Sequence, residues 1–253
     1  MHHTTGGRIA VIAAFVVALV MPAMASAQEE ERTYMQIRTV QVLPGKDAEF
    51  RELAGQVIAA GKAAGWSSRS VWQEVRGDLG KYRILSWPDS LADYDEPFEP
   101  PMNEEDWAAW GDAYSATISS SSLTLVRTHP EFGIPNPEGY EAAMLILRTV
   151  QVAPGQGEAF HEWLENELTP ALAAGGAEGI FYSHGAFGGD VDTWAIAATI
   201  DNWTQLTEPG PLAGLSDEES EALFGSWGDM VWGHAVHVLR YRSEISFDAE
   251  AEE

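Results

Sequence analysis

Histidine is the best candidate for acid–base chemistry in this chain. The sequence holds 7 histidines and no cysteine, so thiol chemistry and disulfide bonds are excluded. His184 lies in a strand-like segment, residues 179–187, and the unperturbed pKa of an imidazole lies near neutrality. We therefore predict that His184 is the acid or base of any active site. The alternative is a hydrogen-bonded histidine with a structural role alone.

Two arginines could bind an anion. Arg38 and Arg148 occupy matching positions in two similar strand-like segments. A buried arginine needs a carboxylate partner or binds an anion, so we predict an anionic ligand between the halves of the protein. The alternatives are an ion pair with an acid such as Glu74, or an exposed side chain.

Aromatic side chains could line an apolar pocket for a flat ligand. The chain has 10 tryptophans, and most of them are expected in the core. Aligning the two halves of the sequence pairs Trp72 with His184 and Tyr82 with Trp194, so one half could keep a site that the other fills. The predicted ligand-binding aromatic residues are Trp72, Tyr82, Trp194, Trp110 and Trp227.

Metal and phosphate motifs are weak. His161 lies within one helical turn of Glu158 and of Glu165, and His234 is three residues from His237. Neither pair has the HExxH pattern or a third ligand at a recognisable spacing, so we predict no metal site. The sequence also has no glycine-rich phosphate loop that opens a helix, and no GxSxG motif.

An internal repeat sets the architecture that must position these residues. RTVQVLPG at 38–45 returns as RTVQVAPG at 148–155, an offset of 110 residues, and Phe50 matches Phe160 at the same offset. This period is too long for a solenoid unit, so the repeat is a small domain that has been duplicated and fused.

Each half has the same predicted order of elements, β-α-β-β-α-β. In the first half, alternation and helical spacing predict strands at 34–42, 68–75, 81–87 and 123–128, and helices at 46–64 and 106–118. In the second half they predict strands at 143–152, 179–187, 193–200 and 236–242, and helices at 158–174 and 218–232. Residues 133–142 form a linker with two prolines.

This order is the ferredoxin-like arrangement, whose sheet has helices on one face only. The other face must be covered, and two copies in one chain can cover it. The strand-Pro-Gly-helix openings at 38–50 and 148–160, with WPDSL at 87–91 and IDNW at 200–203, resemble the dimeric α/β-barrel superfamily. That group includes antibiotic-biosynthesis-monooxygenase-like, NIPSNAP-like and stress-responsive A/B-barrel proteins. The fold class is therefore predicted as α+β, two tandem ferredoxin-like halves that form an α/β barrel within one chain.

Haem is not expected. Chlorite-dismutase-like proteins share this fused topology and carry an iron-binding histidine late in the first helix of the second half. The matching stretch here, residues 168–179, has no histidine. The sequence therefore predicts no cofactor.

The N-terminus indicates an exported protein, and the net charge limits its partners. Residues 9–20 are an apolar run, and residues 21–27 end in the small residues of a signal-peptidase site, which predicts a signal peptide at 1–27 and a periplasmic or secreted protein. An uncleaved anchor is the alternative. The formal net charge of −25 excludes nucleic acids and anionic membrane surfaces as partners. The predicted boundaries are 28–132 for the first half, 143–246 for the second, and 247–253 for an acidic tail.

These observations leave two functions open. The first is an exported barrel that binds a small aromatic or anionic molecule, as a cofactor-free oxygenase or isomerase of the kind the resemblance implies. The second is a non-catalytic binding or assembly subunit of the cell envelope. A pocket that contains His184 or an arginine favours the first, and an exposed apolar patch favours the second.

Overall fold

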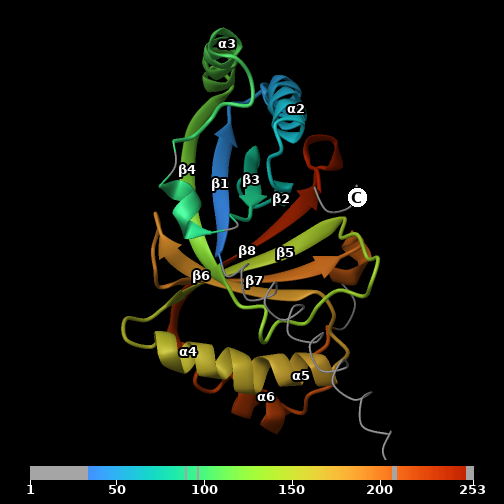
Figure 1. Ribbon diagram of the computed structural model, residues 1–253. Coiled ribbons are helices and arrows are strands. Elements are labelled where there is room, and N and C mark those ends of the chain that lie inside the picture. Colours follow the sequence, from blue (N-terminus) through green and yellow to red (C-terminus); the bar gives the residue numbers. More distant parts are fainter. Residues whose placement is uncertain (1–33, 89, 96, 207–209, 249–253) are drawn as a thin grey trace, which may run out of the picture.

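The computed structural model describes residues 34–88, 90–95, 97–206 and 210–248. The predicted signal peptide and residues 249–253 of the acidic tail lie outside the described residues. Within these ranges the chain folds as two similar halves around one barrel (Figure 1).

Both halves follow the predicted order. The first half contains β1 (Tyr34–Val42), α2 (Asp47–Ala63), β2 (Arg69–Arg76), β3 (Lys81–Ser86), η1 (Leu91–Tyr94), α3 (Glu104–Ser115) and β4 (Ile118–Thr128). The second contains β5 (Met144–Val152), α4 (Gly157–Trp163), η2 (Leu164–Leu168), α5 (Thr169–Ala174), β6 (Ile180–Phe187), β7 (Thr193–Ile200), η3 (Trp203–Leu206), α6 (Asp217–Phe224), α7 (Trp227–Met230), β8 (Val231–Tyr241) and η4 (Ser243–Ile245).

The eight strands close into one antiparallel barrel, in the order β1-β3-β2-β8-β5-β7-β6-β4. The halves join at two seams, where β4 pairs with β6 and β2 pairs with β8. In Figure 1, α2 and α3 lie at one end of the molecule and α4, α5 and α6 at the other, with the barrel between them. The sequence prediction of an α/β barrel within one chain is confirmed.

The last strand of each half begins about five residues earlier than predicted. β4 begins at Ile118 instead of Leu123, and β8 begins at Val231 instead of Val236. Each strand pairs along the full length of its neighbour, since Ile118 reaches Val42 of β1, and Val231 reaches the matching end of β5. The predicted helices 106–118 and 218–232 were therefore too long. The sequence pattern did not indicate where these strands begin, because β4 starts with a serine-rich run and β8 has a glycine near its start.

The helical run predicted at 158–174 contains one wide turn. Residues Leu164–Leu168 form a π-helical turn between α4 and α5. Pro170 lies two residues after this turn; it has no N–H to donate, and its ring would clash with the carbonyl four residues earlier in a regular α-helix. A wider turn relieves that clash, and such turns occur often at functional sites.

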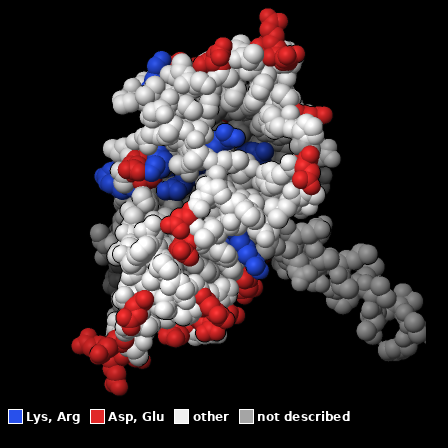
Figure 2. Space-filling view, turned by 90° about the vertical axis from the view of Figure 1, so that its left-hand side faces the viewer, with Lys and Arg blue, Asp and Glu red and all other residues white. Residues whose placement is uncertain are grey.

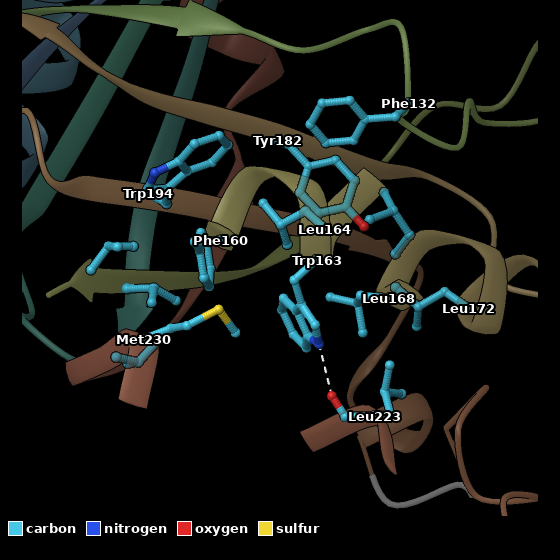
Figure 3. Close-up of a cluster of buried hydrophobic side chains, with 14 residues drawn as sticks. Phe132, Phe160, Trp163, Leu164, Leu168, Leu172, Tyr182, Trp194, Leu223 and Met230 are labelled. Carbon is cyan, nitrogen blue, oxygen red and sulfur yellow. Dashed lines mark hydrogen bonds between the residues drawn. The ribbon is translucent and has the colours of Figure 1, made fainter. Parts of the chain in front are cut away.

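The main core lies between the second half's sheet and its helices. Phe160, Trp163 and Leu164 of the helical run are almost fully buried against this face of the sheet (Figure 3). Trp163 donates its Nε1–H to the carbonyl of Leu223 at 2.7 Å, which joins α4 to α6 (Figure 3). A smaller core lies under α2, where Phe50 packs on Val40. The helices therefore cover the outer face of the barrel.

Each half is completed by residues that follow the last strand of the other half. After β4, Ile134 exchanges two backbone hydrogen bonds with Ile180 of β6, and Phe132 enters the second half's core. After β8, Phe247 exchanges two backbone hydrogen bonds with Arg69 of β2, and Ile245 enters the first half's core. The start of the predicted linker thus packs on the second half.

Candidate functional site

Strand register shows which positions of the two halves are equivalent. His184 lies directly opposite Trp194, and Gln73 lies directly opposite Tyr82. The equivalent of His184 is therefore Gln73, and the sequence alignment of Trp72 with His184 was wrong by one residue. The turn between β6 and β7 is one residue longer than the turn between β2 and β3, which moves the offset from 111 to 112. A one-residue slip moves a side chain to the other face of a sheet.

An open pocket of about 490 Å³ lies on the outer face of the second half, between α4 and the β6–β7 hairpin. His184, Trp194 and His161 contribute the rings that line it. The remaining lining residues are Val152, Gly157, Glu158, Glu162, Glu165, Val191 and Asp192. The structure thus brings His184 and Trp194 together, as the sequence analysis expected of a site.

A hydrogen-bonded series of three side chains ends at this pocket. His129 follows β4 and is only 3% exposed. Its Nδ1 lies 2.8 Å from Oε1 of Glu131, and its Nε2 lies 2.8 Å from Nδ1 of His184. The series runs from a half-exposed carboxylate, through a buried imidazole, to an imidazole at the pocket wall.

The carboxylate fixes the tautomers of both neutral rings. Ionised Glu131 can only accept, so Nδ1 of His129 donates to it and Nε2 of His129 becomes an acceptor. Nδ1 of His184 then donates to His129, which leaves the lone pair on Nε2 of His184. Among the described residues, none is hydrogen-bonded to this nitrogen. Nε2 of His184 is therefore available as a base.

Burial holds these groups in the required protonation states. Burial lowers the pKa of His184 to about 4, with smaller contributions from His129, Arg127 and His161. Burial also lowers the pKa of His129, although its bond to Glu131 acts in the opposite direction. Burial is the largest single influence on Glu131 and would raise its pKa, but the hydrogen bond from His129, a backbone hydrogen bond and the charges of His129 and Arg127 together outweigh it, and the net direction is down. At neutral pH the series is a carboxylate and two neutral imidazoles.

Aromatic rings hold the series in place. Trp194 is 5% exposed and stacks on His129, with ring centroids 5.1 Å apart. It also contacts His184 at 4.8 Å, and His161 edge-on at 5.7 Å. Phe132 also stacks on His129, with ring centroids 5.1 Å apart. These contacts leave the imidazoles little rotational freedom.

The other predicted aromatic residues lie elsewhere. Trp72 pairs with Tyr241 of β8 on the opposite face of the sheet, toward the barrel interior. Tyr82 is fully buried under α2, where its hydroxyl donates to Asp47 at 2.5 Å. Trp110 stacks between Trp107 and Tyr114 on α3, and Trp227 packs on Phe160 and Trp163. No ring of this group lines the pocket beside α4.

The two predicted arginines are also outside the pocket. Arg38 and Arg148 are both exposed on the outer face of the barrel. The suggested partner Glu74 is buried and accepts a hydrogen bond from Nδ1 of His237 at 2.6 Å, with Arg83 at 3.6 Å. Arg38 lies opposite Leu123 of β4, at the edge of a second, apolar groove.

His129, Glu131 and Gly157 were missed by the sequence analysis. His129 and Glu131 belong to the first half in sequence but act in the second half's site, and His129 lies 55 residues before His184. Their equivalents after β8 are Arg242 and Glu244, at an offset of 113. This match to Arg242 and Glu244 could have revealed His129 and Glu131, but only once the start of β8 was known.

Comparisons with known proteins identify the fold. An anthrone oxidase-like protein superposes with a TM-score of 0.58 at 16% identity, over 85% of this chain and 93% of that one. A candidate monooxygenase from Lactobacillus acidophilus NCFM gives 0.55 at 10% identity, over 82% and 93%. A mutant chlorite dismutase from Candidatus Nitrospira defluvii gives 0.51 at 12% identity, over 87% and 95%. No protein-family profile and no curated protein matches the sequence. The chain has the dimeric α/β-barrel fold.

The pocket residues do not fit a haem. A haem would bring two propionate groups, and every charged residue that lines the pocket is acidic. The described residues also contain no group of three or more histidine, aspartate or glutamate side chains placed to hold a metal ion. None of the described helices is long and apolar enough to span a membrane.

Proposed function

We propose that the pocket beside α4 binds a small aromatic molecule and that His184 removes a proton from it. The observation that carries this proposal is the Glu131–His129–His184 series, which ends at an imidazole of the pocket wall. A general base must be unprotonated and within reach of the proton it abstracts, and His184 meets the first condition at neutral pH.

The series compensates for the low basicity of His184. When Nε2 accepts a proton, the ring becomes cationic and its Nδ1–H donates a stronger hydrogen bond to His129. His129 donates in turn to Glu131, so the carboxylate stabilises the new positive charge through the middle ring. The negative charge that forms on the substrate stabilises it from the pocket side. The base is weak at rest and strengthened during the reaction.

Removal of a proton from an activated carbon leaves a carbanion with two possible fates. Reaction with O₂ makes the protein a cofactor-free oxygenase, and return of the proton to another carbon makes it an isomerase. The fold shared with an anthrone oxidase-like protein supports anthrone as the first probe. Its balanced oxidation consumes one O₂, converts the ring CH₂ to a carbonyl and releases one water.

Oxygen uptake with anthrone tests this proposal. We expect His184→Ala to lower the protein-dependent rate by about 100-fold, because a positioned base typically contributes that much. His234→Ala is the matched control, since His234 is exposed and does not line the pocket. Equal rates for the wild type and His184→Ala would remove His184 from the chemistry. Hydrogen–deuterium exchange at the CH₂ without O₂ uptake would favour an isomerase.

A second candidate function is non-catalytic docking to an envelope protein. It is favoured by an apolar groove of about 370 Å³ at the β4–β6 seam between the halves, lined by Gln36, Leu91, Tyr94, Leu123, Leu125, Phe187 and Gly188. Phe187 is 63% exposed and Leu123 is 44% exposed. If docking is the function, Phe187→Ser should release the protein from the envelope fraction and His184→Ala should not. The opposite result favours the enzyme.

A further inference from the structure

The charged wall of the pocket carries one sign only. Glu158, Glu162 and Glu165 line it from the helical run, and Asp192 lines it from the β6–β7 turn. All three glutamates are exposed at the pocket mouth. Among the described residues, no lysine or arginine lines this space. A negatively charged ligand would therefore meet repulsion from both sides of the opening.

The sequence around the pocket extends the same charge. Residues 149–239 contain fourteen aspartates and glutamates and no lysine or arginine. Figure 2 shows acidic side chains gathered over the end of the molecule where the second half's helices lie, and most basic ones away from it. A surface of one sign around a cleft raises the local concentration of ligands of the opposite sign.

Arg127 is the basic residue that acts on this site, and its charge is offset by the Glu131 carboxylate. Arg127 of β4 lies opposite His184 in the strand register and acts to lower its pKa. Arg127 also interacts with the Glu131 carboxylate, and this contributes to the low pKa of Glu131. The arginine therefore belongs with the hydrogen-bonded series and does not offset the four carboxylates at the mouth.

The aromatic wall suits the same kind of ligand. Trp194 and His161 meet nearly edge-on, at an interplanar angle of 78°, so the pocket presents rings in two directions. An indole binds cations more strongly than other side-chain rings do, and aromatic walls are the usual receptor for an organic ammonium group. The pocket is also large enough for a small aromatic ligand.

We infer that the pocket beside α4 takes a cationic aromatic compound, a flat ring system that carries a protonated or quaternary nitrogen. This rests on the proposed aromatic pocket and names the class of its ligand. The ring lies against Trp194, and the positive nitrogen faces Glu158, Glu162 and Asp192. This replaces the anionic ligand expected from Arg38 and Arg148, which do not line the pocket.

Three probes of nearly equal size and different charge test this inference by calorimetry. They are 1-methylquinolinium, 1-methylnaphthalene and 1-naphthoate. We expect the cation to bind the wild-type protein about tenfold more tightly than the neutral probe, and the anion to bind least. The preference should shrink as NaCl rises from about 20 mM to about 300 mM, because salt screens the exposed carboxylates.

Two double variants separate local from global charge. Glu158→Gln with Glu162→Gln should reduce the affinity for the cation by about fivefold and leave the neutral probe unchanged. Glu167→Gln with Glu178→Gln makes the same change in net charge away from the pocket and should leave both unchanged. Equal affinities for the three probes, or tightest binding of the anion, would overturn the cationic class and leave the aromatic pocket standing. If no probe binds at about 5 mM, the proposed pocket fails and the inference fails with it.

Discussion

Equivalent positions of the two halves form a filled network of side chains in the first half and an open pocket in the second. In the first half, Asp47 begins α2 and accepts hydrogen bonds from Tyr82 at 2.5 Å, Gln73 at 3.0 Å and Arg51 at 3.1 Å. Arg242 follows β8 and donates to Gln73. The site is filled by its own side chains, and burial followed by the bond to Asp47 raises the pKa of Tyr82.

In the second half, the same positions hold a different set of residues. Gly157 replaces Asp47, His161 replaces Arg51, and the strand pair becomes His184 and Trp194. His129 replaces Arg242 at the end of the neighbouring strand. Gly157 has no carboxylate to draw these rings together, and a Cβ built on it would meet nothing within 4 Å. One missing side chain keeps the second site open.

The comparison suggests how a duplicated fold separates two tasks. In the first half the polar residues hydrogen-bond to one another in a closed network that stabilises the barrel. The second half keeps the same backbone but leaves its polar groups facing a pocket. The repeat in the sequence therefore explains the architecture, and the residues that break it explain the site.

The largest expected effect is a loss of unfolding free energy when the tryptophan that joins two helices of a half is removed. Trp163 and Trp110 each donate an indole N–H to a carbonyl of the neighbouring helix, at 2.7 Å and 2.9 Å. Trp163 is 2% exposed, whereas Trp110 is only partly buried. We expect Trp163→Ala to lower the free energy of unfolding by about 4 kcal/mol and Trp110→Ala by about 2 kcal/mol. Urea unfolding measures both, and equal losses would show that the second half is not the more tightly packed one.

A smaller effect should follow from making the second half resemble the first. In Gly157→Asp the carboxylate would lie where Asp47 lies, would occupy part of the pocket and would favour protonation of the bare Nε2 of His184. We expect the neutral probe 1-methylnaphthalene to bind about thirtyfold more weakly, a loss of about 2 kcal/mol. Gly157→Ala is the control and should bind normally, because its Cβ has open space. Unchanged binding by Gly157→Asp would show that this position does not set the opening.

A third effect is on the pH dependence of stability. The unfolded chain protonates His184 near its ordinary pKa of 6.5, and the folded chain does so only at about 4. The neutral ring therefore stabilises the fold above pH 6.5, and this contribution is lost as the pH falls toward 4. The variant His184→Gln should lose less stability than the wild type across this window in urea titrations. A variant with the wild-type slope would show that the His184 pKa is not lowered.

The sequence alone was sufficient to predict the fold but only part of the site. The repeat of RTVQV-PG and Phe50 with Phe160 was sufficient for the barrel, because the order of elements leaves one sheet face to cover. His184 and Trp194 were found by aligning the central hairpins of the two halves, although that alignment misplaced the partner of His184 by one residue. His129 and Glu131 were missed because they follow a strand of the other half, and only barrel closure brings them to His184.

The central claim is that the second half holds an open site whose base is ready at neutral pH. Long-range ¹H–¹⁵N NMR of the histidine rings, recorded from about pH 4 to about pH 8, tests it most directly. We expect His184 to carry its proton on Nδ1, to have a bare Nε2 and to stay neutral well below pH 6.5. We also expect His129 to carry its proton on Nδ1. A proton on Nε2 of His184, or an ordinary titration near pH 6.5, would contradict it.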